Sequence, residues 1–238
     1  MKIFTYHENI NFKNQLELVQ LWKKSWEMQG FEACILTRED AERSPYYKEF
    51  VTNIKQVHID IAGHEIRPYG LSCYLRWLAY SVQKDQELFL VSDYDVINKN
   101  FKTNEIIESC DKISFMDRYC PCLAYGSSEQ FLTFCKNIIS ISNQNKDSIK
   151  QNYQIKSLSH YHDQEFLLLN HGILFNYNIC PARKYVALYE HNNPEMEKYN
   201  LFHIAHRSVH EAKINYPQFG PINSDQLRII LTFNILNK

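Results

Sequence analysis

Hydrophobic and polar positions recur along the first part of the chain with two periods, one typical of strands and the other typical of helices. Residues 2–6 and 31–36 are short, largely apolar runs. Between them, residues 14–28 place leucine, valine and tryptophan at helical spacing among lysines and glutamates, and Gly30 ends this predicted helix. The order strand, amphipathic helix, strand predicts a parallel βαβ unit.

A helix and a fully apolar strand come next. Residues 71–82 carry apolar side chains on one helical face, while the pattern over 41–69 indicates helix plus loop. Residues 88–91, Leu-Phe-Leu-Val, are apolar at every position, which is typical of a strand buried on both faces of a parallel sheet. Ligands of open α/β sheets bind at the carboxyl ends of the strands, so we expect functional residues directly after residue 91.

The rest of the chain predicts shorter elements. Ser127 and Gln130 form a capping box for a helix that runs to about residue 141, and the polar residues 142–154 indicate a surface connection. The apolar tail, residues 226–233, could pack on the core, pair with another subunit or rest on a membrane. The other predicted elements are strands at 112–116, 186–188 and 201–204 and a short buried helix at 166–169.

Composition narrows the classes of protein that fit. The 238 residues include 26 lysines and arginines against 27 aspartates and glutamates, a balance that argues against binding nucleic acid through bulk charge. Six glycines form no glycine-rich phosphate loop, and seven scattered cysteines do not indicate a disulfide framework. With no signal peptide and no transmembrane segment in the pattern, we expect a cytoplasmic protein, either soluble or peripheral to a membrane.

Two aspartates, Asp93 and Asp95, directly follow the apolar strand. Burying an unpaired carboxylate costs several kcal/mol, so such a pair needs water, cations or a metal ion. Carboxylates at positions i and i+2 can bind one Mn²⁺ or Mg²⁺ ion, with diphosphate oxygens and water completing the octahedral shell. The alternative is a solvated loop that happens to hold two aspartates.

The arginine-bearing helix around Arg76, the polar break and the strand that ends in Asp93-Tyr94-Asp95 resemble the core of GT-A fold glycosyltransferases, whose D-x-D motif ends such a strand. The resemblance implies an α/β fold, with one Rossmann-type domain over residues 1–238 and a mostly parallel central sheet flanked by helices. It further implies that residues 1–100 bind a nucleotide-sugar and that residues 101–238 bind the acceptor.

The same resemblance implies roles for residues near the donor. Asp93 would contact the donor's ribose or the metal, and Asp95 would ligate the metal. Tyr94 would line the donor pocket, where Thr5 and Tyr6, at the end of the first strand, also lie. Arg76 would meet the diphosphate or a carboxylate, unless it forms a structural ion pair between helix and sheet.

Two later groups complete the expected site. GT-A enzymes often take a late histidine as a metal ligand, which makes His203 and His206 candidates. A pure histidine zinc site that adds His210 is the competing interpretation. Asp163 and Glu165 lie where many inverting GT-A enzymes hold their catalytic base, although Asp163 could equally be a helix cap.

Together these features predict a metal-dependent glycosyltransferase that uses Mn²⁺ or Mg²⁺ and moves a sugar from a nucleoside-diphosphate sugar, UDP-linked rather than GDP-linked. The acceptor would be a hydroxyl of a glycan, a lipid-linked group or a protein. A nucleotidyltransferase is an alternative, against which the lack of a glycine-rich loop after the first strand counts. A non-catalytic carbohydrate-binding protein on a decayed GT-A domain is another.

Overall fold

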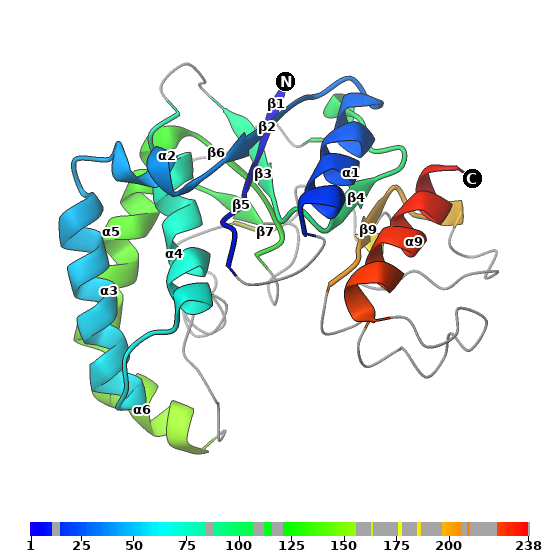
Figure 1. The fold of residues 1–238 in the computed structure, drawn as a ribbon. Helices are drawn as coiled ribbons and strands as arrows, with labels where there is room; N and C mark the ends of the chain where they lie inside the picture. The colour runs from blue at the N-terminus through cyan, green and yellow to red at the C-terminus, as the bar shows by residue number, and fades with distance from the viewer. Residues whose placement is uncertain are drawn as a thin grey trace.

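The structure of the chain is a computed structural model. It describes residues 1–10, 15–83, 88–106, 112–115, 121–155, 163, 176–177, 185–186, 197–205, 209 and 223–237. Figure 1 shows helices on both sides of a central sheet. The predicted α/β fold with a mostly parallel sheet is therefore confirmed.

The central sheet has the strand order β2-β1-β3-β6-β5-β7. In that order the strands are Glu32–Leu36, Lys2–Tyr6, Phe89–Ser92, Leu123–Gly126, Ser114–Phe115 and Asn176–Tyr177. β1 pairs parallel with β2 and with β3, and β5 pairs parallel with β7. β6 runs antiparallel to both of its neighbours, β3 and β5, so it is the reversed strand of this sheet.

The helices form two groups. Figure 1 shows α3, α4 and α5 gathered on one side of the sheet, and α1 and α9 on the other. The described helices are α1 (Gln15–Glu27), α2 (Arg38–Glu42), α3 (Tyr47–Ala62), α4 (Pro68–Tyr80), η1 (Thr103–Glu105), α5 (Ser128–Gln144), α6 (Lys146–Ile155) and α9 (Ser224–Leu236). The capping box predicted at Ser127 is present, since its side chain accepts a hydrogen bond from the backbone N–H of Gln130.

Strand β3 is buried on both faces, as its apolar sequence predicts. Phe89 and Val91 belong to a core shared with α3, α4 and α5, whereas Leu90 belongs to a second core shared with α1 and α9. Side chains of a strand alternate between its two faces, so a strand between two helical layers needs apolar residues at consecutive positions. This burial fixes where β3 ends and hence where the following aspartates lie.

A smaller sheet lies beside the main one. Its strands β4 (Val96–Asn98), β9 (Leu201–His203) and β8 (Tyr185–Val186) pair in the order β4-β9-β8. β4 is antiparallel to β9, so a late segment of the chain lies against the residues that directly follow the aspartates. The aspartate loop therefore connects the two sheets.

Several local predictions need correction. The residues expected as a polar connection, 142–154, form the end of α5 and most of α6. The strands β4 and β6 had no sequence signal that we recognised, and the helix expected at 166–169 lies outside the described residues. The apolar tail is helix α9, which buries Leu227, Leu231 and Ile235 in the core. Within the described part of the chain, none of the helices has both the length and the apolar character needed to cross a bilayer.

Candidate metal and donor site

The loop between β3 and β4 carries Asp93 and Asp95, and backbone hydrogen bonds fix both of its sides. The N–H of Asp93 donates to the carbonyl of Cys122 at 2.8 Å, and the N–H of Ile204 donates to the carbonyl of Asp95 at 2.8 Å. The N–H of Val96 donates back to the carbonyl of Asp93 at 3.0 Å, which closes a turn. The turn holds both carboxylates at the carboxyl end of β3.

Helix α1 is hydrogen-bonded to the residues on either side of this loop. The indole N–H of Trp22 donates to the Ser92 hydroxyl at 2.8 Å, and that of Trp26 donates to the carbonyl of Val96 at 3.0 Å. Both tryptophans are fully buried. A buried indole N–H needs an acceptor, so these two bonds tie α1 to both ends of the aspartate loop.

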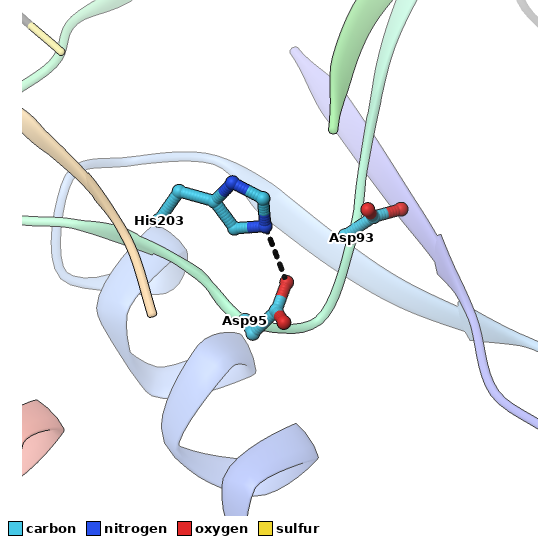
Figure 2. Close-up of side chains that lie close together, drawn as sticks. All are labelled: Asp93, Asp95 and His203. Atoms are coloured by element: carbon cyan, nitrogen blue, oxygen red, sulfur yellow. Dashed lines mark ion pairs between the residues drawn. The ribbon is translucent and has the colours of Figure 1, made fainter. Parts of the chain in front are cut away.

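Asp93, Asp95 and His203 lie close together, as the predicted metal site requires. Figure 2 shows the Asp95 and His203 side chains facing each other, with Asp93 beside them and its carboxylate turned the other way. One ligand atom from each lies within 4.8 Å of those from the other two, and they form the only such group among the described residues. Asp95 Oδ1 lies 3.3 Å from His203 Nε2. His203 comes from β9, about a hundred residues after the aspartates.

The donor atoms in this group fit a divalent cation. Two carboxylates and an imidazole are ligands that Mn²⁺ accepts, and the carboxylates also suit Mg²⁺. Asp95 Oδ1 is buried and makes no hydrogen bond of good geometry among the described residues; its contact there is the ion pair with His203 Nε2. A metal ion bound between these ligands would give this buried oxygen a further partner.

Arg76 of α4 forms the first of two arginine clusters around the aspartates. Its Nη1 donates to Asp93 Oδ1, and its Nε and Nη2 donate to Asp163 Oδ2 at 3.1 and 2.5 Å. The indole N–H of Trp77 donates to the same Asp163 oxygen at 2.8 Å. The ion pair between helix and sheet, left open by the sequence, is therefore present, and it includes Asp163.

Arg228 of α9 forms the second cluster. Its Nη2 donates to Asp95 Oδ2 at 2.7 Å, its Nε donates to the carbonyl of Ile204 at 2.9 Å, and its Nη1 lies 3.7 Å from Asp225. Burial raises the pKa of Asp95, but His203 and Arg228 outweigh it and hold that pKa well below its usual range. The Asp95 carboxylate is thus ionised.

These ion pairs leave an excess of negative charge. Arg76 pairs with two carboxylates, and Arg228 pairs with two others. Counting the arginines and aspartates alone, the two clusters together carry two more negative than positive charges, and a protonated His203 would reduce this excess to one. A divalent cation between Asp93 and Asp95 would balance that excess, which agrees with the fit of the donor atoms.

The end of β1 lies beside the aspartate loop and holds the predicted donor-pocket residues Thr5 and Tyr6. Thr5 Oγ1 and His7 Nε2 are buried without a hydrogen-bond partner in the described structure. The ring of His7 meets the ring of Tyr94 edge to face, with centroids 5.7 Å apart. Buried polar atoms without a partner at this edge of the sheet can be satisfied by a bound polar ligand.

The Tyr6 hydroxyl makes a protein contact rather than pointing into an unfilled space. It donates to Glu8 Oε2 at 3.1 Å, and Glu8 pairs with Arg38 at 2.5 Å. Burial, followed by the charge of Glu8, raises the pKa of Tyr6 above its usual range. This hydroxyl is therefore neutral and donating at physiological pH.

The structure brings most of the predicted site residues to one region. Asp93, Asp95 and His203 are grouped, and Arg76 and Asp163 contact each other beside Asp93. The predicted ligand His206 and the predicted catalytic residue Glu165 lie outside the described residues. Arg228 and His7 were not predicted from the sequence as site residues. His7 could have been predicted, because it directly follows Thr5 and Tyr6 at the end of β1.

Comparisons with known proteins concern the fold. No family model matches the sequence, and no curated protein sequence does. Among solved structures, the chain is similar to the galactosyltransferase LgtC in complex with donor and acceptor sugar analogs, with 13% identity and a TM-score of 0.48 over 85% of this chain and 86% of that one. It is also similar to a glycosyltransferase involved in glycosylation of the major capsid of PBCV-1, with 12% identity and a TM-score of 0.45 over 86% and 93% of the two chains.

Proposed function

We propose that this protein is a metal-dependent glycosyltransferase that moves a sugar from a nucleoside-diphosphate sugar to a hydroxyl group. The observation that carries the proposal is the group formed by Asp93, Asp95 and His203 at the carboxyl end of β3. Two carboxylates and an imidazole from different elements converge there, beside an arginine and beside buried polar atoms without partners. Ligands of open α/β sheets bind at this edge.

The metal ligands in this proposal are Asp93, Asp95 and His203, with His206 as a further candidate. When bound, Mn²⁺ or Mg²⁺ neutralises the charge that develops on the departing diphosphate. Asp95 Oδ1 faces His203, and the negative excess of the two arginine clusters favours a bound cation. Arg76, with a side chain that is 12% exposed, supplies the guanidinium nearest to Asp93 and can meet a diphosphate oxygen.

The donor would lie between the end of β1 and the aspartate loop. His7 and Thr5 offer buried polar atoms without partners, and Tyr94 offers a ring to the base. We propose a UDP-linked donor over a GDP-linked one, with the acceptor hydroxyl on a glycan, a lipid-linked group or a protein. Tyr6 contributes through the position of its backbone and ring, because its hydroxyl is engaged by Glu8.

Asp163 and Glu165 stay predictions for the catalytic base, a role that serves an inverting reaction. Asp163 is 1% exposed, and three donor groups from Arg76 and Trp77 converge on its Oδ2. These contacts support a second role for Asp163, which is to orient Arg76 toward the donor. The two roles predict different kinetics and are separated in the Discussion.

The proposal is tested by donor binding and donor hydrolysis with and without Mn²⁺. Asp95→Asn keeps the shape of the side chain but removes its charge, so it should abolish Mn²⁺-dependent binding of UDP and UDP-sugars. Asp60→Asn is the matched control, because Asp60 also forms an ion pair, with Lys146, but on α3 and α6. Metal-dependent binding that survives in Asp95→Asn would remove Asp95 from this role.

Product analysis separates the proposal from its alternatives. Release of a nucleoside diphosphate indicates glycosyl transfer, whereas release of pyrophosphate indicates nucleotidyl transfer. Thermal shifts with UDP, GDP and Mn²⁺ test for a carbohydrate-binding protein without catalysis. If glycans raise the melting temperature and no combination of nucleotide and metal does, the enzymatic proposal fails.

A further inference from the structure

Arg228 is a buried arginine on helix α9. It is 3% exposed and lies far along the chain from the aspartates. An arginine is almost never buried to this extent unless its charge is paired. The charge of Arg228 must therefore be paired inside the protein, which the packing of α9 alone does not provide.

Helix α9 is built to place this side chain. Leu227, Leu231 and Ile235 form its apolar stripe in the core around Trp22. Ser224, Arg228 and Thr232 repeat every four residues and form a buried polar stripe next to the apolar one, in which the Thr232 hydroxyl donates to the Arg228 carbonyl at 2.8 Å. This stripe places the guanidinium of Arg228 on a buried side of the helix.

The guanidinium joins the two chain segments that supply the candidate metal ligands. One N–H reaches Asp95 Oδ2, on the loop after β3, and another reaches the carbonyl of Ile204, the residue after His203. Two donors of one rigid plane thus fix the loop relative to β9. With Oδ2 engaged, the second oxygen of Asp95, Oδ1, is the one that faces His203.

We propose that Arg228 is a positioning residue of the metal site, which orients Asp95 and keeps it in register with His203. The inference rests on the proposed function, since it assigns no metal ligand of its own. Residues that hydrogen-bond to a metal ligand without contacting the metal orient that ligand, and removing one typically weakens metal affinity about 10–100-fold. The role depends on the fork geometry of arginine and not only on its charge.

The competing explanation is that Arg228 only neutralises Asp95. The two explanations predict effects of opposite sign on metal affinity. If Arg228 acted through charge alone, its removal would make the site more negative and Mn²⁺ would bind more tightly. If Arg228 positions Asp95, metal affinity falls even when the positive charge is kept.

The experiment measures Mn²⁺ binding to the full chain by calorimetry and by the electron paramagnetic resonance of free and bound Mn²⁺. Arg228→Lys keeps the charge but cannot reach Asp95 and the Ile204 carbonyl together, so we expect an affinity about tenfold weaker and a changed spectrum of the bound ion. Arg228→Met keeps the length of the side chain and should also weaken binding, because the loss of positioning outweighs the gain from the lost positive charge. Ile235→Ala is the control for loss of packing, because Ile235 is buried on the same helix among apolar residues.

The proposal is overturned if Arg228→Lys binds Mn²⁺ with the wild-type affinity and spectrum, or if Arg228→Met binds it more tightly. It is also overturned if Ile235→Ala weakens binding as much as Arg228→Lys. If Arg228→Met does not fold, Arg228→Lys alone decides. A wild-type chain that binds no Mn²⁺ would count against the proposed metal site itself, and it is distinguished from these results because every variant would then match the wild type.

Discussion

The two arginine clusters beside Asp93 and Asp95 are built from the same groups but differ in exposure. The Arg76 and Asp93 side chains are 12% and 27% exposed, whereas those of Arg228 and Asp95 are 3% and 13% exposed. Arg76 also has a second buried partner, Asp163, at 2.5 Å, while the second carboxylate near Arg228 lies 3.7 Å away. The Arg76 cluster is therefore the more exposed of the two, and the Arg228 cluster is the more deeply buried.

This difference separates two tasks that one aspartate pair has to perform. A group that meets a substrate must be partly accessible, and its protein partners must leave room for the substrate to compete. A group that fixes the geometry of a ligand works best when buried, because the low dielectric of the interior strengthens its interactions. We therefore expect substitutions in the Arg76 cluster to change donor binding, and those in the Arg228 cluster to change stability and metal binding.

The largest expected difference is in stability and compares Asp95→Ala with Asp93→Ala. Loss of Asp95 leaves a buried guanidinium without its close ion-pair partner, which costs about 3–5 kcal/mol of unfolding free energy. Loss of Asp93 should cost about 1 kcal/mol or less, because the pair is partly exposed and Arg76 keeps Asp163. Urea unfolding of both variants measures the two costs, and equal costs would contradict the distinction between the clusters.

The second expectation concerns Asp163→Asn. If Asp163 orients Arg76, the variant should raise the KM for the donor about tenfold, since a hydrogen bond to a charged group contributes about 1.5–3 kcal/mol. The turnover number should change less than the KM. A catalytic base would behave differently, because its loss lowers kcat about 10²–10⁴-fold. Steady-state kinetics with varied donor separates the two roles, and a fall in kcat at unchanged KM would assign Asp163 as the base.

Much of the first half of the fold could be predicted from sequence, because its signals are local. The βαβ unit at the start and the strand before Asp93 follow from periodicity and from a run of four apolar residues. The strands β4 and β6 lack such signals. β4 has three residues, of which Asn98 is polar and buried, and β6 pairs antiparallel with β3, which is a choice of tertiary structure and not of local sequence.

The site shows the same division. Asp93 and Asp95 were found because they follow a buried strand, and the resemblance of their surroundings to GT-A enzymes pointed to Arg76, Asp163 and His203. Arg228 was missed because most residues around it are apolar, so the segment was interpreted as an apolar tail. Its partner Asp95 is 133 residues away in sequence, and no local spacing relates the two.

The third expectation concerns the helix cap of α9, and it tests whether Arg228 depends on its helix. The Asn223 side chain accepts a hydrogen bond from the Gln226 N–H at 2.9 Å, just before Arg228. Asn223→Ala should cost about 1 kcal/mol and also weaken Mn²⁺ binding slightly, because the first turn of α9 loosens. Ser127→Ala removes the matching cap of α5 and should cost a similar amount while leaving Mn²⁺ binding unchanged. Thermal unfolding and calorimetry measure the two effects.

The smallest expected effect lies on the donor side, at His7. The His7 ring contacts the ring of Tyr94 edge to face, and the Arg228 guanidinium lies 5.9 Å from the centroid of the same Tyr94 ring. Burial lowers the pKa of His7 below that of an unfolded histidine, so the unfolded chain takes up a proton first as the pH falls. The contribution of His7 to stability is thus present above the unfolded pKa of about 6.5 and is lost as the pH falls through the lower folded value.

The histidine variant His7→Gln should therefore lose less melting temperature than the wild type between about pH 7 and pH 5. His64→Gln, at an exposed histidine, is the control for exchanging a histidine elsewhere on the chain. Bound nucleotide sharpens the measurement: if His7 Nε2 contacts the donor, UDP with Mn²⁺ should stabilise the wild type more than His7→Gln at neutral pH. Equal stabilisation of both would exclude His7 from the donor pocket and would leave the Arg76 cluster as the donor contact on this side.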